Sequence, residues 1–505
     1  MLSRLLASVA LAAALTSAAE ARDGSVDVVA PFEIKGADPS TSGNVFIKMD
    51  VGETLVNTDA GGQLMPGLAT GWQVSEDGLE WRFQLREGVM FHDGSPMTAD
   101  AVAAALNVAR SRPGLLETAP ITAIVADTGD QEAGDLVVRL SEPFAPLPAF
   151  MSEYRSIILA PSAYDAAGNV TEVTGTGAYR VTRMDAPLRL EVAAFDGYWG
   201  GAPAIDRATY QAVGRAETRA LLAESGDADY VFNLDPASIR RLSSVDSLDV
   251  LSVPTPRSLL LKVNAGHPAL NQAEARRALS LAIDREGLAL AILRYPAGAD
   301  QILPPSIGEW HSDTVEPLTY DPAAAAGLLA GLGWVPGPDG ILTREGTRFS
   351  LTLTTYPDRP ELPLSAAVLQ QMFAEIGVEV TIDSTNSSEV PVRHADGTLD
   401  IALFARNFAL VPDPLGTFLT DYAPGGDWGA MGWNSAEFTG LIRDLSQGRG
   451  GQEARDRAIA ILQDELPVIP VAWYQQTAAV SKGIIGAVID PYERTIGLKD
   501  MRWAE

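Results

Sequence analysis

The sequence predicts a large α/β protein with two or three domains, and three observations point to this fold class. The chain has 505 residues, which is more than one hydrophobic core normally organises. Its hydrophobic content of 46% is enough to bury cores of that size. Its 46 Gly and 33 Pro residues are spread evenly, so they divide the chain into many short helices and strands.

The first 21 residues have the pattern of an export signal. Arg4 precedes an apolar run from Leu5 to Leu15, and Ala19-Glu20-Ala21 matches a small-x-small cleavage site. The run is too short to span a bilayer. The chain has no Cys, which excludes disulfides, thiol chemistry and a lipid-anchored Cys. We therefore expect a signal peptide at 1–21 and a periplasmic mature protein, with a buried N-terminal helix as the alternative.

The segment from Gly78 to Leu106 predicts strand, turn, strand, loop and helix in that order. Apolar and polar residues alternate over 81–86, which is typical of a strand with one buried face. The alternation resumes at 89–91, and the loop 93–96 ends it. Thr98 then has the position of an N-cap residue for a helix that continues to Leu106.

Later segments carry similar signals. Residues 173–184 place a Gly-rich bend before a strand, and residues 217–232 indicate a helix, a Gly stop and a strand. Residues 271–293 predict a helix that begins with Asn271 and Glu274 as a capping pair. Strands and helices alternate in these segments, which agrees with a mixed α/β protein.

The sequence of residues 81–100 resembles the signature of the extracytoplasmic solute-binding proteins of family 5. Its pattern is W-x-F-x-L-R-x-G-V-x-F-x-D-G-x-P-x-T-A-D. These are the peptide- and nickel-binding subunits of ABC importers. The sequence FDGYWGGAPAID at 195–206 is similar to a second motif of the family. The order and spacing of the segments match the family from near the mature start to about Trp473.

This resemblance implies a two-lobed periplasmic-binding-protein fold of type II, cluster C, with an extra domain in the first lobe. The implied domains are a first lobe at 22–45, 172–257 and 475–505, an extra domain at 46–171, and a second lobe at 258–474. Two extended segments, 252–264 and 468–480, would cross between the lobes.

Catalytic and metal-binding motifs are absent from the sequence. There is no G-x-S-x-G, no G-x-x-x-x-G-K and no H-E-x-x-H. The four His residues have no metal-ligand spacing; they are His92, His267, His311 and His394. We expect no enzyme activity, no bound metal and no cofactor. The net charge of −28 argues against nucleic acid or anionic lipid as a partner.

The resemblance also suggests residues that bind ligand between the lobes. The nickel-binding branch of the family reads R-T-W where Arg406, Asn407 and Phe408 stand here. That branch also uses an Arg after the signature helix, where Arg112 falls, and a second Arg close to the position of Arg155. Guanidinium groups bind carboxylates bidentately, so a carboxylate-bearing solute is the implied ligand.

Two Trp residues, Trp428 and Trp433, complete the predicted site as a stacking surface. The alternative for all six residues is structural: the Arg residues pair with acids, Phe408 belongs to the core, and the Trp residues pack a loop.

The chain also departs from its relatives at the site. Peptide binders of the family carry an Asp where Leu410 stands, and the nickel branch has a pocket Trp where Leu115 stands. Residues 421–434 lack the His with which that branch contacts metal. We therefore expect a metal chelate that carries its own ligands more than a peptide. We expect a monomeric receptor that delivers this solute to an ABC permease in the inner membrane, with a peptide receptor or a signalling adaptor as alternatives.

Overall fold

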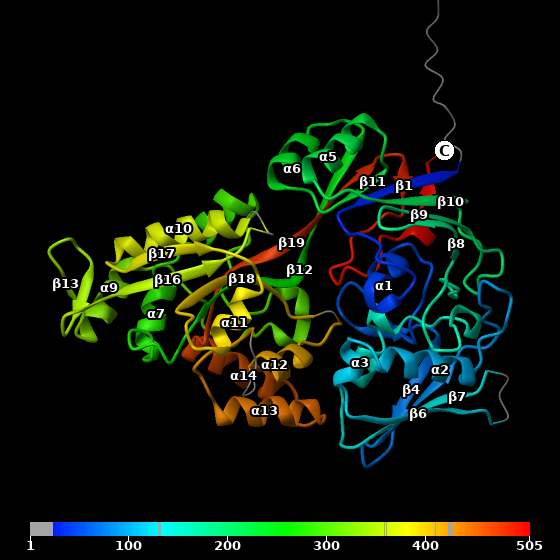
Figure 1. Cartoon of the computed structure of the whole chain (residues 1–505), viewed down its shortest axis with the longest axis horizontal. Coiled ribbons are helices and arrows are strands. Elements are labelled where there is room, and N and C mark those ends of the chain that lie inside the picture. Colours follow the sequence, from blue (N-terminus) through cyan, green and yellow to red (C-terminus); the bar gives the residue numbers. More distant parts are fainter. Residues whose placement is uncertain are drawn as a thin grey trace, which may run out of the picture.

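A computed structural model describes residues 24–129, 133–357, 359, 361–409, 411–422 and 428–504. The predicted signal peptide lies outside these residues. Two halves lie side by side and are joined by long strands (Figure 1). We call the half that contains β1 and β8–β11 the first lobe, and the half that contains β16–β18 the second lobe. The predicted two-lobed α/β fold is confirmed.

One ten-stranded sheet runs through both lobes. In spatial order its strands are β17 (Glu379–Ser384), β16 (Ser350–Thr355), β18 (Ile401–Asn407), β12 (Leu248–Val263), β19 (Val468–Ser481), β11 (Tyr230–Phe232), β1 (Ser25–Ala30), β10 (Arg207–Ala212), β9 (Arg189–Ala194) and β8 (Tyr179–Asp185). Strands β1, β10 and β11 are parallel in the first lobe, as are β16, β17 and β18 in the second.

The long strands β12 and β19 join the lobes, as the predicted crossings at 252–264 and 468–480 require. They pair antiparallel from Leu248 opposite Ser481 to Lys262 opposite Val468. β19 also pairs with β11 of the first lobe, whereas β12 also pairs with β18 of the second. The two strands therefore belong to both lobes at once (Figure 1).

The first lobe packs its helices on the strands of its sheet. These smaller elements are α1 (Pro39–Lys48), η1 (Tyr154–Ser156), η2 (Pro161–Ala163), α5 (Ala216–Ser225), α6 (Pro236–Leu242), β20 (Ile484–Ile485), η5 (Leu498–Asp500) and β21 (Arg502–Trp503). The predicted order of helix, Gly stop and strand is confirmed, because Gly226 ends α5 at a φ of 77° before β11. Such a positive φ favours Gly.

A separate four-stranded sheet, in the order β4-β5-β7-β6, has its own hydrophobic cluster. The elements of this region are β2 (Val56–Thr58), β3 (Leu64–Pro66), β4 (Ala69–Val74), β5 (Glu80–Leu85), α2 (Ala99–Arg110), α3 (Leu115–Thr118), β6 (Ile121–Asp127), β7 (Asp135–Leu140) and α4 (Leu147–Phe150). The side-chain oxygen of Thr98 accepts from the Ala101 amide, so the predicted N-cap is confirmed. Residues 89–91 are not a strand; Met90 forms only an isolated bridge with Pro96.

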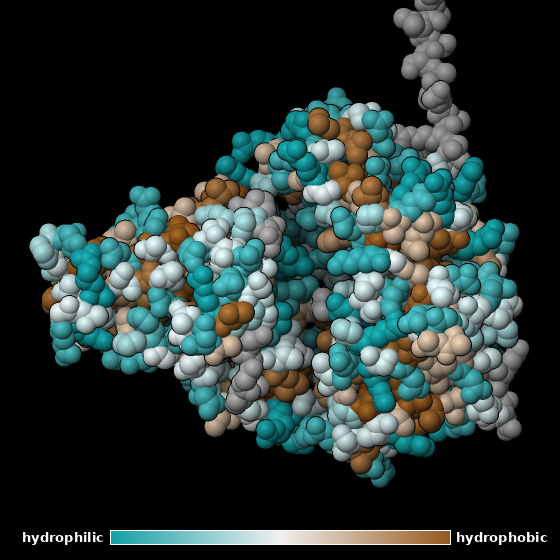
Figure 2. All heavy atoms as spheres, viewed as in Figure 1, coloured by the Kyte–Doolittle hydropathy of each residue, from teal (hydrophilic) through white to brown (hydrophobic). Residues whose placement is uncertain are grey.

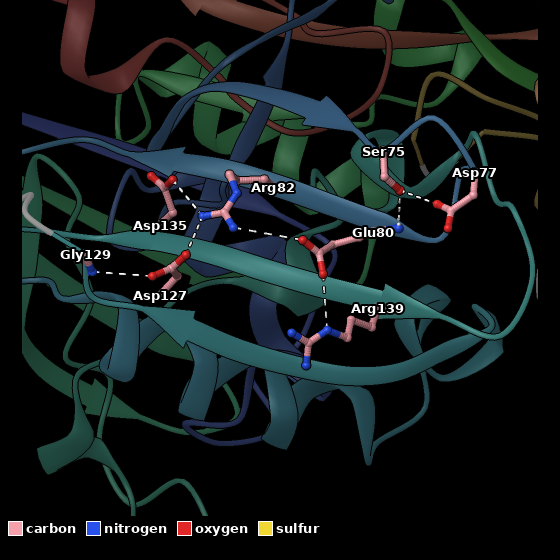
Figure 3. A network of polar contacts seen from close by, with 8 residues as sticks. All are labelled: Ser75, Asp77, Glu80, Arg82, Asp127, Gly129, Asp135 and Arg139. Atoms are coloured by element: carbon pink, nitrogen blue, oxygen red, sulfur yellow. Dashed lines mark hydrogen bonds and ion pairs between the residues drawn. The ribbon is translucent and has the colours of Figure 1, made fainter.

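The face of β5 that does not enter this core carries charged side chains (Figure 3). Asp127 and Asp135 are directly opposite each other on β6 and β7. The Arg82 guanidinium donates to both, at 2.7 and 3.2 Å, and so offsets their repulsion. Glu80 and Arg139 form a second cross-strand pair at 3.2 Å. The alternation of apolar and polar residues over 81–86 therefore gives β5 one face in the core and one face that carries ion pairs.

The signature loop attaches this region to the first lobe. The His92 amide donates to the Gly175 carbonyl at 2.9 Å, and His92 Nε2 contacts the Gly177 carbonyl at 3.0 Å. A Cβ on either Gly would collide with the carbonyl oxygen of Val51 or Asp50. The Gly-rich bend at 175–177 is therefore needed for close backbone contact.

The second lobe is mostly helical around its three strands. Its remaining elements are α7 (Ala273–Leu281), α8 (Arg285–Leu288), η3 (Ala289–Leu293), η4 (Pro305–Trp310), α9 (Pro322–Gly331), β13 (Val335–Pro336), β14 (Leu342–Arg344), β15 (Thr347–Arg348), α10 (Glu361–Glu375), α11 (Glu389–Ala395), α12 (Leu415–Asp421), α13 (Ala436–Ser446) and α14 (Gly451–Glu465). The predicted capping pair Asn271 and Glu274 is wrong, because the N-cap of α7 is Gln272 and makes no side-chain cap.

Buried apolar side chains separate into clusters that follow these regions. One contains residues of the second lobe from Leu259 to Tyr474 together with Tyr492, and another surrounds the four-stranded sheet. Val411 belongs to the latter, so the two regions touch across the interlobe boundary. The boundaries 46–171 and 258–474 remain our proposal for the domains. Among the described residues, every helix is too short or too polar to cross a bilayer.

Candidate ligand-binding cleft

A hollow lies between the two lobes (Figure 2). The amide of Asn233, just after β11, donates to the Thr477 carbonyl of β19 at 2.8 Å. The amide of Phe408, just after β18, donates to the Pro256 carbonyl of β12 at 2.8 Å. Ligands in open α/β sheets bind beyond the carboxyl ends of parallel strands. The middle of β12 and β19 is therefore the floor of the candidate site.

This floor contains a bulge. Pro254 is opposite Gln475 and Ser258 is opposite Trp473, so residues 255–257 all lie opposite the single residue Tyr474. A bulge bends its strand locally. It lies where the strands pass from one lobe to the other, which makes it the natural place for a hinge.

Arg257, in the bulge, connects the floor to the C-terminal part of the chain. Its Nη2 lies 3.2 Å from Glu493 Oε1, and both side chains are about one-fifth exposed (20% and 17%). Glu493 has a left-handed φ of 58°, which is strained for a residue with a Cβ. Its Oε1 is buried and accepts no hydrogen bond from the described residues.

Arg155, predicted as a ligand-binding residue, lies on η1 against α1. Its Nη1 donates to Glu153 Oε1 at 2.5 Å, and the other Glu153 oxygen accepts from the Leu115 amide at 2.8 Å. Burial raises the pKa of Glu153, and the Arg155 charge opposes that rise. Arg155 Nε is buried and finds no acceptor among the described residues. Arg155 Nε is thus an unused donor among the described residues.

Tyr154 lies beside this guanidinium. The Arg155 guanidinium carbon is 5.0 Å from the centre of the Tyr154 ring, a cation–π distance. Burial raises the pKa of Tyr154; the Arg155 charge lowers it, and Glu153 and Glu493 raise it. The charges of Arg155 and Glu493 thus both act on this phenol.

Arg112 is held by structural contacts. It forms an ion pair with Asp38, the N-cap residue of α1, and its Nη2 donates to the Gly168 carbonyl at 2.8 Å. The side chain is 20% exposed. These contacts fix the end of α2 to the start of α1, so a ligand would have to compete with Asp38 for Arg112.

Arg406 forms a bidentate pair inside the second lobe. Its Nε and Nη2 donate to the two oxygens of Asp421 at 2.6 and 2.8 Å. Asp421 is 4% exposed, and burial raises its pKa while Arg406 lowers it. The two planar groups fit each other, which leaves Arg406 little freedom to bind another carboxylate.

The aromatic residues of the predicted site pack with the second-lobe core. Phe408 is 1% exposed, and its ring centre is 5.8 Å from that of Phe418. Trp428 packs on Phe404 at 5.8 Å, and Trp433 donates from Nε1 to Glu465 at 2.5 Å. In this conformation the three aromatic residues therefore have structural roles, which is the alternative to ligand binding given in the sequence analysis. Their contact with ligand stays a prediction.

The structure therefore divides the six predicted residues between the lobes. Arg112 and Arg155 belong to the first lobe, and the other four are in the second lobe. Leu410, whose identity argued against peptides, lies outside the described residues. Leu115 lies across the boundary from Gly416, where an added Cβ would be 3.7 Å from a Leu115 methyl carbon.

Sequence reasoning missed Lys48, Arg257 and Glu493 at the floor. Lys48 ends α1 directly after the buried residues Val45, Phe46 and Ile47, and a Lys that continues an apolar run is a usable signal. Arg257 follows two Pro residues in a strand, which can indicate a bulge. Nothing local marks Glu493, because its neighbours come from distant parts of the chain.

Metal ligands do not gather in this structure. Within the described ranges, no group of three His, Cys, Asp or Glu side chains could hold a metal ion. His92 and His311 hydrogen-bond to backbone carbonyls, and His394 Nδ1 lies 2.7 Å from Lys262 Nζ.

Two lobes joined by two crossing strands are the architecture of a two-lobed binding protein. The chain belongs to the bacterial extracellular solute-binding proteins, family 5, because a model of that family matches residues 63–429. The match includes the signature segment, the floor strand β12 and the pair Arg406–Asp421.

The chain is similar to the glutathione-binding protein GsiB of Salmonella typhimurium, with 28% identity over 326 residues. The alignment covers 64% of this chain and 61% of GsiB, so it spans about three-fifths of that relative. Similar GsiB proteins of other Salmonella strains give the same coverage.

Two solved structures have the same fold. NikA from Brucella suis in complex with Fe(III)-EDTA superposes with a TM-score of 0.85 at 21% identity, covering 95% of this chain and all of that one (100%). A nickel ABC transporter protein from Bacillus halodurans gives a TM-score of 0.82 at 24% identity, covering 94% of this chain and 99% of that one. At these identities the likeness establishes the fold alone.

Proposed function

We propose that the chain is the periplasmic solute-binding subunit of an ABC importer and that it captures a small carboxylate-bearing solute between its lobes. The favoured solute is a metal chelate, which a membrane permease then receives. The observation that carries this proposal is Arg155 on η1 of the first lobe, whose side chain is 29% exposed and whose Nε lacks an acceptor among the described residues. A carboxylate would satisfy that donor, and lobe closure would strengthen the contact by excluding water.

The chelate is favoured over a bare metal ion by the absence of a three-ligand cluster within the described residues. It also agrees with the compounds named for similar proteins. Both EDTA and glutathione carry carboxylates, and one of the similar structures is a nickel transporter protein.

A small peptide of the glutathione type is the second candidate. It is supported by Glu493, whose buried Oε1 accepts no hydrogen bond from the described residues and could accept one from an ammonium group. A receptor that presents its solute to a chemoreceptor would use the same cleft. Reading frames for a permease and an ATPase beside the gene would favour import.

The test uses Arg155→Lys, which keeps a positive charge beside Glu153 and removes the guanidinium fork. We expect weaker binding of Fe(III)-EDTA and of glutathione, with the melting temperature of the ligand-free protein nearly unchanged. The control is Arg183→Lys, because the pair of Arg183 with Asp185 is exposed. Native mass spectrometry and thermal-shift titration give the readout. If neither compound, nor Ni²⁺ with histidine, nor any peptide binds the wild type, the proposal is wrong.

A further inference from the structure

A cavity lies where α1 and β2 meet the C-terminal segment of the chain. Its volume is about 290 Å³, and its walls come from two stretches, 47–67 and 486–500. The volume is comparable with that of the smallest small-molecule pockets, about 300 Å³. Among the described residues that line it, none belongs to β12, β19 or the second lobe. This cavity is therefore built by one half of the molecule, unlike a cleft between the lobes.

Arg494, on the wall of this cavity, is a buried guanidinium without an acidic partner. It is 5% exposed, and no described Asp or Glu oxygen lies within 4.0 Å of its nitrogen atoms. Its Nη1 donates to Thr58 Oγ1 at 2.7 Å, and its Nη2 makes a longer bond to Thr54 Oγ1 at 3.4 Å. Burial lowers its pKa to about 10, so the group stays charged at neutral pH. A guanidinium has five N–H donors, so most of these lack an acceptor among the described residues.

Other groups of the cavity are also donors without acceptors. Lys499, half-buried on η5, lines the cavity, and its ammonium has no hydrogen bond or ion pair with a described residue. Asn57 Oδ1 accepts from the Thr58 amide at 2.9 Å, which leaves the Asn57 amino group to donate. The Thr58 hydroxyl accepts from Arg494 and keeps its own proton to donate. The cavity therefore presents unused donors and two positive charges.

The carboxylates that line the cavity have protein partners or face water. Asp50 accepts from a backbone amide at 2.9 Å, and Asp490 accepts from two at 3.2 and 2.7 Å. Glu53 accepts from three side chains, and Asp500 is exposed. Burial raises the pKa of Asp50 to about 7, so about half of this carboxyl is neutral at that pH. The cavity therefore offers donors to an anion more than acceptors to a cation.

We propose that this cavity binds a small oxyanion, either a carboxylate or a phosphate, through Arg494, Lys499 and the Thr58 hydroxyl. Guanidinium groups pair with both kinds of oxyanion through two parallel hydrogen bonds. The anion supplies the buried guanidinium with the partner that the described residues do not. The acidic side chains of the lining restrict the site to small anions, because they repel a polyanion. The site goes beyond the proposed function, since it uses neither the second lobe nor the solute of the cleft.

The experiment measures binding of inorganic phosphate, succinate and Fe(III)-EDTA to the mature protein by titration calorimetry. The variants are Arg494→Met and Lys499→Met, with Arg457→Met and Lys482→Met as controls that remove the same charges at exposed positions. We expect phosphate or succinate to bind the wild type, and each cavity variant to weaken that binding by about tenfold or more, the size of one lost charged hydrogen bond. The controls should have no effect, and Fe(III)-EDTA binding should change little in any variant.

Labelling of the wild type with an amine-reactive reagent tests the site without any variant. Lys499 is partly exposed and Lys482 is exposed, so mass spectrometry can follow both. Phosphate or succinate should slow the labelling of Lys499 and leave that of Lys482 unchanged.

The outcomes separate this site from the cleft. Absence of phosphate and succinate binding, or equal binding by Arg494→Met, Lys499→Met and the wild type, would overturn the site and leave the proposed function intact. Loss of anion binding in Arg155→Lys with none in Lys499→Met would place the anion in the cleft and also overturn the site. Protection of Lys499 by phosphate in a protein that binds no cleft solute would support the site and overturn the proposed function.

Discussion

Replacing Arg406 with Met is expected to destabilise the ligand-free protein by about 3–5 kcal/mol, the usual cost of breaking a buried ion pair from one side. Asp421 is 4% exposed and has two short bonds to Arg406, at 2.6 and 2.8 Å. Without Arg406 its carboxylate is buried with one weaker hydrogen bond, from Thr420 at 3.3 Å. The loss of stability comes from the buried Asp421 carboxylate, which no longer has a counter-ion.

The same reasoning gives the pH dependence. Burial already raises the pKa of Asp421, and loss of Arg406 removes the main opposing charge, so the folded-state pKa rises further. A raised folded-state pKa destabilises at pH values above it, and the penalty fades as pH falls toward the unfolded-state value of about 3.9. The difference between wild type and variant should therefore be larger at neutral pH than in mild acid.

A matched control is available on the surface. Arg457 forms an equally bidentate pair with Glu437, at 2.6 and 2.9 Å, but both side chains are at least half exposed. Arg457→Met should change stability little, since water solvates the remaining carboxylate. The double variant Arg406→Met with Asp421→Leu should recover most of the loss.

Urea denaturation at two pH values measures these differences, with hydrogen exchange of β18 as a local readout. Equal effects at Arg406 and Arg457 would refute the reasoning. So would an Arg406→Met loss that grows on acidification.

Two further predictions concern the junction beneath the signature loop. Burial raises the pKa of Asp50 to about 7, against the opposing charge of Lys499, so its ionised form costs about 4 kcal/mol. Asp50→Asn should therefore raise the melting temperature relative to wild type above about pH 8 and lose this advantage below about pH 4; an advantage confined to acid would contradict it. Gly177→Ala should lower the free energy of unfolding by about 1–3 kcal/mol, because its Cβ would collide with the Asp50 carbonyl. Gly327→Ala, on helix α9 with open space around the new Cβ, should be neutral or slightly stabilising in the same denaturation experiment.

Local patterns predicted the elements well. The alternation in β5 and the Thr98 cap follow from residues within one turn or strand of each other, and both are present. The capping pair at Asn271 failed because α7 begins at Ala273, so the cap position falls on Gln272. Helix boundaries depend on tertiary packing that a local pattern does not contain.

The partners of the predicted site residues could not be read from the chain. Arg112 meets Asp38 and Arg406 meets Asp421 only because the fold brings separate elements together. In a chain with 65 acidic residues, sequence alone offers too many possible partners for each Arg. Arg257 and Glu493 are even farther apart in sequence, and their ion pair is a property of the two-lobed fold.

The central claim is that the two lobes close on a solute around the bulge in β12 and β19. Small-angle X-ray scattering of the purified protein, with and without glutathione or Fe(III)-EDTA at saturating concentration, tests it most directly. The account predicts that a compound that binds by calorimetry also reduces the radius of gyration. A bound compound that leaves the scattering curve unchanged, or that the protein chemically converts, would contradict it.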